Sequence, residues 1–276
     1  MKVALIIPLH NQLENWPKIV KGIENQTIVP DRVIAVLDRP SDDDEMSQYM
    51  IDTKLNITYP VQRESKENKD KFMAPHNRNV GIQSAIKDDC DIFIFIDGDC
   101  IPQNKLIESH INKLKYGIPV LSVGRRRESI YRWQDRREYV PELSHLGLFP
   151  EDGLLINNTE LLKNSLIVWS CNMALNLSAV KLLKRLNRKY FNRSEVFSSD
   201  FNGSWGGEDA YLGIQAHYCR ILITTIGEKR SGIEHIDHPR PEGKYNMNHM
   251  ELLNKQMETL RQKVRIHPLD VSFFIT

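Results

Sequence analysis

The sequence lacks the features that would place it in several large functional classes. Its 276 residues hold 37 Lys+Arg against 36 Asp+Glu, which leaves a formal net charge of only +1. A protein that holds nucleic acid by its overall charge needs a clear basic excess, so we exclude that class. An anionic ligand would instead have to be held by local groups, such as a metal ion, a few arginines or backbone N–H groups.

Long apolar runs are also absent. A membrane-spanning helix needs about 20 apolar residues in succession, and the longest candidate, Ile92–Ile96, has only the length of a strand. The apolar run that ends at Pro8 has no signal-peptide cleavage site. The four cysteines are widely spaced and form no C-x-x-C pair, which argues against a disulfide framework and a zinc knuckle. We expect reduced thiols in a cytoplasmic protein.

What the sequence does contain is an alternation of short apolar runs and amphipathic segments. In the first half the predicted strands are Val3–Ile7, Arg32–Leu37, Leu55–Tyr59 and Asp91–Ile96, and the predicted helices are residues 13–23, 75–87 and 106–114. This alternation predicts an α/β fold, with a mostly parallel central sheet flanked by helices. Sheets of this kind bind ligands at the carboxyl ends of their strands.

The second half of the chain is less regular. Its predicted strands are Gly117–Val123 and Cys219–Ile226, and its predicted helices are one capped by Ser178, one at Glu208–Tyr218 and one at Asn246–Val264. The last helix repeats apolar residues at spacings of three and four, which favours packing on the parent domain over a coiled-coil partner face. Because no linker or repeat interrupts the chain, we predict a single domain over residues 1–276.

Two carboxylates follow the last strand of the first half. Asp97 and Asp99 stand one residue apart, so both side chains can point to one side and share a hard cation such as Mg²⁺ or Mn²⁺. Gly98 between them lets the backbone approach a ligand closely. The alternative is a solvated Asp-Gly turn that only ends a strand.

Two further segments carry polar groups that suit a ligand site. The run from Trp205 to Asp209 reads Trp-Gly-Gly-Glu-Asp and opens a helix. Its glycines permit a tight backbone, although its two acids would also stabilise the helix N-terminus. His235 follows the last predicted strand and is able to complete a metal shell begun by aspartates. The alternative for this histidine is a structural or surface role.

Together these motifs resemble those of the family 2 glycosyltransferases, which have the GT-A (Rossmann-like) fold. The similarity is closest to the branch with a galactosyltransferase-like C-terminal part, which includes bacterial chondroitin and hyaluronan synthase transferase domains. Other segments match in the family's order: Ile6–Asn11, Val36–Asp38, Ala74–Gly81 and Cys171–Ala174. The resemblance implies a nucleotide-sugar-binding half (1–124), an acceptor-binding half (125–245) and a C-terminal helix and tail (246–276).

The resemblance implies transfer of a sugar from a nucleotide diphosphate donor, UDP-linked in most such enzymes. Asp38 would contact the base or ribose, and Pro8 and His10 would line the same pocket. Asp97 would reach the ribose and the cation. Arg78 would add positive charge near the diphosphate.

The implied cofactor is Mn²⁺ or Mg²⁺, which acts as a Lewis acid on the diphosphate leaving group. Asp97 and Asp99 would hold the ion, with Asp99 favoured as the direct ligand. His235 would be a further ligand. His238 is its rival, because it begins a run that matches a His-x-x-Pro-x-Gly-Lys motif of the chondroitin-synthase type.

Catalysis is assigned by the same resemblance to two adjacent acids. Asp209 would be the general base that takes the proton of the acceptor hydroxyl, and Glu208 would hydrogen-bond sugar hydroxyls. Trp205 would be an apolar platform for a sugar ring, and Gly206 and Gly207 would let sugar and backbone approach. The related retaining branch carries Asn at the position of Asp209, so an acid there favours inversion.

The implied acceptor is a glycan or a lipid-linked saccharide, bound by Arg125–Pro150 and Asn187–Asn202. The arginines of the first segment would suit an anionic acceptor or are simply solvated surface. The implied setting is polysaccharide biosynthesis in the cytoplasm or at the inner face of the membrane, with at most peripheral membrane contact. Two rival functions are a nucleotidyltransferase on a similar fold and a non-catalytic module that binds sugar nucleotides or glycans.

Overall fold

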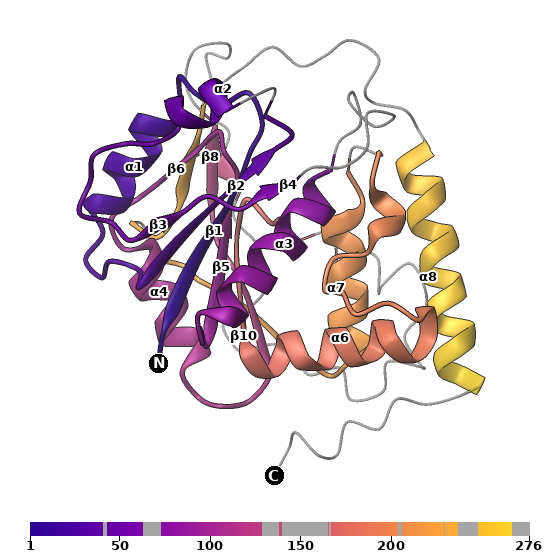
Figure 1. Cartoon of the computed structure of the whole chain (residues 1–276). Helices are drawn as coiled ribbons and strands as arrows, with labels where there is room; N and C mark the ends of the chain where they lie inside the picture. Colours follow the sequence, from indigo (N-terminus) through magenta and orange to yellow (C-terminus); the bar gives the residue numbers. More distant parts are fainter. Residues whose placement is uncertain are drawn as a thin grey trace.

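The computed structural model describes residues 1–40, 43–62, 73–128, 138–139, 165, 167–203, 206–228, 230–236 and 248–266. An eight-stranded sheet lies at the centre, with helices on both faces (Figure 1). Its strands are β1 Val3–Leu9, β2 Arg32–Asp38, β3 Ile57–Thr58, β4 Val61–Gln62, β5 Ile92–Ile96, β7 Val120–Val123, β10 Asn172–Asn176 and β11 Leu222–Thr225. The order across the sheet is β11-β7-β10-β5-β1-β2-β3, and β4 also pairs with β2.

The sheet is mostly parallel, as predicted. β1 pairs in parallel with β2 and β5, β2 with β3 and β4, and β7 with β11. Among the described strands of this sheet, only β10 runs antiparallel to its neighbours, β5 and β7. Every residue of β5 is buried, because helices cover both faces of the sheet. This double burial explains why the strand is an uninterrupted apolar run in the sequence.

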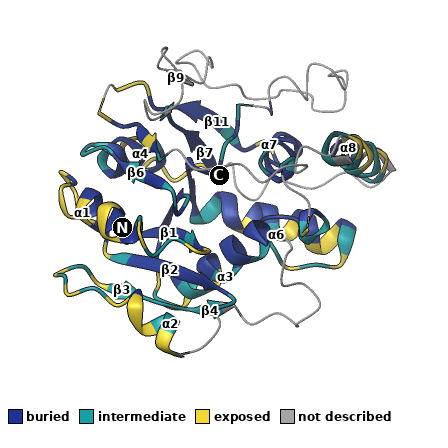
Figure 2. Ribbon diagram, turned by 90° about the horizontal axis from the view of Figure 1, so that it is seen from above, coloured by how far each residue is buried: buried dark blue, intermediate teal, exposed yellow. Residues whose placement is uncertain are grey.

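The helices form two layers around the sheet (Figure 2). α1 (Trp16–Glu24) and α4 (Leu106–Leu114) pack on one face, and α3 (Ala74–Lys87), α6 (Leu177–Phe191) and α7 (Glu208–Tyr218) pack on the other. The short α2 (Asp43–Gln48) follows β2. α8 (Asn248–Ile266) packs against α6 and α7, so the predicted packing of the last helix on the parent domain is confirmed. The buried residues of α8 are Leu253, Met257, Leu260 and Val264.

Several local predictions need correction. The helix predicted to be capped by Ser178 is capped by Asn176, whose Oδ1 accepts a hydrogen bond from the N–H of Ala179 at 3.1 Å. The predicted third strand shrinks to Ile57–Thr58. A second sheet that we did not predict has the order β6-β12-β8-β9. Its strands are β6 Cys100–Pro102, β8 Arg126–Glu128, β9 Glu138–Tyr139 and β12 Ile233–His235, which are too short to show a periodicity in the sequence.

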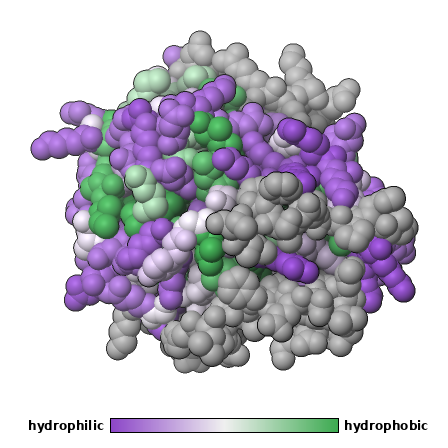
Figure 3. Space-filling model, turned by 90° about the horizontal axis from the view of Figure 1, so that it is seen from below, coloured by the Kyte–Doolittle hydropathy of each residue, from purple (hydrophilic) through white to green (hydrophobic). Residues whose placement is uncertain are grey.

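The structure also describes the cysteines and the exposed apolar side chains. All four cysteines are buried free thiols, as predicted. No helix in the described ranges is both long enough and apolar enough to cross a membrane. On the face drawn in Figure 3, hydrophilic residues cover most of the described surface and apolar residues lie between them. Exposed apolar side chains such as Met50 and Tyr116 come from separate loops, which is ordinary for a folded protein.

Candidate functional site

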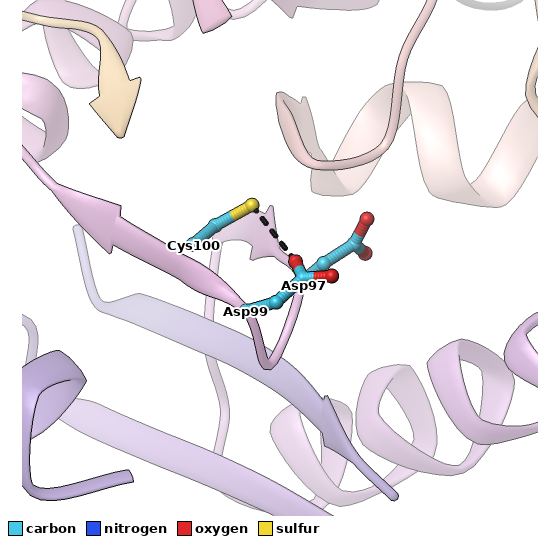
Figure 4. A group of neighbouring side chains, drawn as sticks. All are labelled: Asp97, Asp99 and Cys100. Carbon is cyan, nitrogen blue, oxygen red and sulfur yellow. Dashed lines mark hydrogen bonds between the residues drawn. The ribbon is translucent and has the colours of Figure 1, made fainter. Parts of the chain in front are cut away.

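The turn after β5 presents the first pair of acids. Asp97 and Asp99 flank Gly98 on the turn that leads from β5 into β6 (Figure 4). A Cβ atom at position 98 would lie 2.7 Å from the carbonyl oxygen of Pro8, so glycine is needed for this close approach to β1. Ligand atoms of Asp97, Asp99 and Cys100 lie within 4.8 Å of one another, which is close enough for one ion to contact both carboxylates.

The thiol of Cys100 orients an acid rather than joining the ligand set. Its Sγ donates a hydrogen bond to Asp99 Oδ1 at 3.1 Å, drawn as the dashed line in Figure 4. Burial, and then the charge of Asp99, raise the pKa of this thiol well above its ordinary value. Only the thiolate form of cysteine is a good metal ligand. The carboxylates are therefore the ligands that this turn offers.

An imidazole reaches the same turn from the second sheet. β12 pairs with β6 so that His235 stands opposite Cys100, and the N–H of Ile236 donates to the carbonyl oxygen of Asp99 at 2.7 Å. His235 Nε2 lies 3.4 Å from Asp99 Oδ2. Carboxylate oxygens with an imidazole nitrogen suit Mn²⁺ and similar divalent ions. The structure thus brings together Asp97, Asp99 and His235, three of the residues predicted to bind metal.

A buried arginine connects this turn to the second pair of acids. Arg78, on α3, donates from Nη2 to Asp97 Oδ1 at 2.9 Å and from Nη1 to Glu208 Oε1 at 3.3 Å. Its Nη1 also lies 3.7 Å from Asp209 Oδ1. We expected this side chain near the diphosphate, but it is only 3% exposed and its guanidinium lies among the three carboxylates. One cation therefore faces three acids, which leaves an excess of negative charge.

Two glycines shape the turn that carries the second pair of acids. Gly206 and Gly207 have φ angles of +91° and +90°, a conformation that is strained for residues with a side chain. A Cβ atom at position 207 would also lie 3.1 Å from the ring of Phe201. This tight turn places Glu208 and Asp209 in the first turn of α7, where the helix dipole favours negative charge.

Burial changes the proton affinity of both acids on α7. It raises the pKa of Glu208 to about 8, helped by the charge of Asp209 and opposed by that of Arg78. It also raises the pKa of Asp209, and here the charge of Arg78 opposes the shift. A carboxylate of raised pKa is a stronger proton acceptor, so this pair is suited to general base chemistry.

A second group of polar side chains lies where β1 and β2 end. The two strands run in parallel with Pro8 beside Val36, so both carboxyl ends meet at one edge of the sheet. His10 Nδ1 lies 3.6 Å from Asp38 Oδ2, which brings together the residues predicted to bind the nucleoside. Arg39, which we did not predict, donates from Nε to Asp38 Oδ1 at 2.7 Å. In the sequence, the only indication that Arg39 belongs to this site was its position next to Asp38.

The Cys171–Ala174 segment, which resembles a family motif, contains a side chain with a structural role, Asn172. Asn172 Oδ1 accepts from His110 Nε2 at 2.9 Å, and Asn172 Nδ2 donates to the carbonyl oxygen of Arg125 at 2.8 Å. This amide therefore joins α4, β8 and β10. Among the predicted site residues, Trp205 and His238 lie outside the described residues, as does most of the predicted Arg125–Pro150 acceptor segment.

Comparison with known proteins adds sequence relationships to this geometry. The family described as "Glycosyl transferase family 2" matches residues 4–183. The O-antigen chain rhamnosyltransferase RfbN of Salmonella typhimurium is 34% identical over 101 residues, which are 37% of this chain and 29% of that protein. The match thus spans less than a third of the relative's length.

Solved structures share the arrangement of strands and helices. S. aureus TarS 1–349 in complex with UDP-GlcNAc superposes with a TM-score of 0.61 at 16% identity, covering 99% of this chain and 69% of that one. A further structure of S. aureus TarS gives a TM-score of 0.56 at 15% identity and covers 99% of this chain and 41% of that one. At this level of identity the likeness concerns the fold, and it confirms the predicted GT-A architecture.

Proposed function

Because the chain belongs to glycosyl transferase family 2, we propose that this glycosyltransferase is a metal-dependent, inverting enzyme with a UDP-sugar donor. Its acceptor is a glycan or a lipid-linked saccharide. The observation that carries the proposal is the Arg78 cluster, in which one buried guanidinium contacts Asp97 on the metal-binding turn and also Glu208 and Asp209 on α7. Donor and acceptor chemistry would therefore meet at one point.

The cation would be held by Asp99 and His235, with Asp97 beside them. Asp99 and His235 already face one another, whereas Asp97 shares its charge with Arg78. When bound, Mn²⁺ or Mg²⁺ would supply Lewis-acid stabilisation of the diphosphate leaving group. Comparing Mn²⁺ affinity in His235→Ala and His238→Ala tests this choice, because only the first substitution should weaken binding.

The donor nucleoside would occupy the pocket at the ends of β1 and β2. Asp38 is positioned by Arg39, and Pro8 and His10 supply the adjoining wall. The TarS structure with bound UDP-GlcNAc supports a UDP-linked donor for this chain as well. Trp205 and Gly207 would contact the transferred sugar.

Asp209 would act as the general base. Its carboxylate accepts the proton of the acceptor hydroxyl while that oxygen bonds to the anomeric carbon on the face opposite the leaving diphosphate, which inverts the centre. Arg78 holds this carboxylate toward the donor side. Glu208 would hydrogen-bond a sugar hydroxyl. A nucleotidyltransferase would use Asp97 and Asp99 but leave this pair without a role, and the family assignment excludes both it and a non-catalytic module.

The proposal is tested by measuring UDP release from UDP-GlcNAc, and nucleotide release from other UDP-, GDP- and dTDP-sugars, with Mn²⁺ or with EDTA. We expect release from a UDP-sugar that requires the metal and that is lost in Asp99→Ala. The matched control is Asp44→Ala, which removes an exposed acid from α2 and should leave the rate unchanged. If neither EDTA nor Asp99→Ala changes the rate, the metal assignment is wrong.

A further inference from the structure

Arg126 lies in the described part of the segment expected to bind the acceptor, on β8. β8 pairs in parallel with β12, so that Arg126 stands beside Ile233 and Arg127 beside Glu234. Side chains alternate between the two faces of a strand, and Ile233 and His235 are buried whereas Glu234 is exposed. Arg126 is therefore on the face that carries His235, and its neighbour Arg127 is on the outer face.

An aromatic ring lies next to this arginine. The guanidinium carbon of Arg126 is 5.3 Å from the ring centroid of Trp169, which is within the range of a cation–π contact. Trp169 is only partly buried. Its ring and the guanidinium thus form a paired surface of one apolar and one cationic group.

The position of Trp169 relative to α7 follows from the residue before it. A Cβ atom at Gly213 would lie 3.0 Å from Cγ2 of Val168, so this segment packs directly on α7. Gly213 comes four residues after Asp209, which places the two on the same side of the helix. Ser170, the residue after Trp169, is close enough to Asp209 to act on the pKa of that carboxyl. Trp169 itself packs against the core cluster that contains Cys171 and Ile233. Burial raises the pKa of the Cys171 thiol, and the charges of Arg126 and Asp209 both act on it, so the arginine and the proposed base lie near the same strand end.

The charges around this surface determine which class of acceptor it could bind. The acids at Asp97, Asp99, Glu208 and Asp209 outnumber Arg78, so a negatively charged acceptor would be repelled unless another cation faced it. Arg126 comes from the second sheet, and its guanidinium has paired N–H donors that match carboxylate or phosphate oxygens.

We propose that Arg126 and Trp169 form an acceptor subsite for a saccharide that carries a carboxylate or a phosphate group. The ring of Trp169 packs against the apolar face of the sugar, and Arg126 binds the anionic group. The inference rests on the proposed function, because a sugar held here would present its hydroxyl toward Asp209.

The test is sugar binding by calorimetry or saturation-transfer NMR to the full chain loaded with Mn²⁺ and UDP. The probes are methyl β-D-glucuronide for the carboxylate, glucose 6-phosphate for the phosphate and methyl β-D-glucoside as the neutral control. We expect wild type to bind one of the charged probes about tenfold more tightly than the neutral probe, the effect of a charge-assisted pair. The preferred probe identifies the anionic group.

Single substitutions distinguish the contribution of Arg126 and Trp169 to probe binding from that of neighbouring residues. Arg126→Met should remove the preference for the charged probe, Arg126→Lys should retain part of it, and Trp169→Leu should weaken binding of all probes. Arg127→Met, the same change on the outer face, should leave the preference intact. Equal binding of charged and neutral probes by wild type would overturn the proposal. It would also be overturned if Arg126→Met weakened UDP binding and left the preference unchanged, because the arginine would then serve the donor diphosphate.

The same samples distinguish this inference from the proposed function. UDP binding and metal-dependent UDP release from UDP-GlcNAc report on the donor site and do not require the subsite. Absence of the sugar preference in wild type, together with normal UDP release, would contradict the subsite alone. A preserved preference without any nucleotide release would support the subsite and contradict the proposed donor chemistry.

Discussion

Two arginine–carboxylate sites at the same edge of the sheet differ in charge: one is balanced and the other has an excess of acids. At the end of β2, Arg39 pairs with one acid among the described residues, Asp38, with 2.7 Å between Nε and Oδ1. Beneath the turn after β5, Arg78 faces Asp97, Glu208 and Asp209. A buried excess of negative charge is unfavourable until protons or a cation offset it. The difference supports two distinct roles. The balanced site would bind the nucleoside, and the acid-rich site would bind a cation and take part in proton transfer.

The largest effect is expected from breaking the acid-rich site. Arg78→Met leaves three carboxylates near one another without their cation, and removing one member of a buried ion pair costs about 3–5 kcal/mol. Urea unfolding should show this loss together with the loss of UDP release. Arg78→Lys keeps the charge but not the planar fork, so it should recover most of the stability and little of the activity. A wild-type unfolding midpoint in Arg78→Met would contradict the cluster's role.

A second large effect is expected on turnover alone. Asp209→Asn removes the proton acceptor and should slow UDP release by roughly 10²–10⁴-fold. Affinity for the donor, measured by calorimetry, should stay near that of wild type, because the nucleoside pocket is elsewhere. Asp88→Asn is the matched control, since Asp88 is a comparably exposed acid that pairs with Arg32 at 3.1 Å. A normal rate in Asp209→Asn would eliminate this residue as the base.

The burial of Glu208 beside Asp209 also predicts a pH dependence of stability in metal-free protein. The pKa of Glu208 rises from its ordinary value of 4.5 to about 8 on folding, so the folded chain keeps a proton that the unfolded chain releases. Stability from this group is therefore fully present below pH 4.5 and declines as pH rises toward 8, by at most about 1.4 kcal/mol per pH unit. Unfolding curves of Glu208→Gln should lack this decline. Parallel curves for wild type and variant would show that Glu208 does not titrate in this range.

The smallest effect is expected at the balanced site. Arg39→Met leaves only one acid without its partner, and the adjacent His10, whose side chain is 52% exposed, leaves a route for water to the carboxylate. We expect a loss of stability of about 1–3 kcal/mol and weaker UDP binding with an unchanged maximal rate. A greater loss of stability than in Arg78→Met would reverse the comparison between the two sites.

The donor side of the molecule was predictable because its residues follow long strands. β1, β2 and β5 are buried on both faces, so their apolar runs stand out in the sequence and mark where Pro8, Asp38 and Asp97 must emerge. The parallel order then brings these ends to one edge of the sheet. Cys100 was noticed only as a thiol, because its hydrogen bond to Asp99 depends on the conformation of the turn.

The acceptor side of the molecule, which includes β8, β12 and Trp169, could not be predicted in the same way. β8 and β12 are strands of three residues each, and the pairing that places Arg126 beside Ile233 joins segments more than a hundred positions apart. The contact between Arg126 and Trp169 likewise depends on the path of the chain before β10. Arg78 was correctly placed on a helix, but its three acidic neighbours come from β5 and α7 and required the assembled fold.

The central claim is that the acid-rich site binds a divalent cation and the balanced site does not. Calorimetric titration of Mn²⁺ into the chain with UDP present tests it directly. We predict one Mn²⁺ per chain, with binding lost in Asp99→Ala and retained in both Arg39→Met and the surface control Asp44→Ala. Mn²⁺ binding that is unchanged in Asp99→Ala, or absent from wild type, would contradict the account.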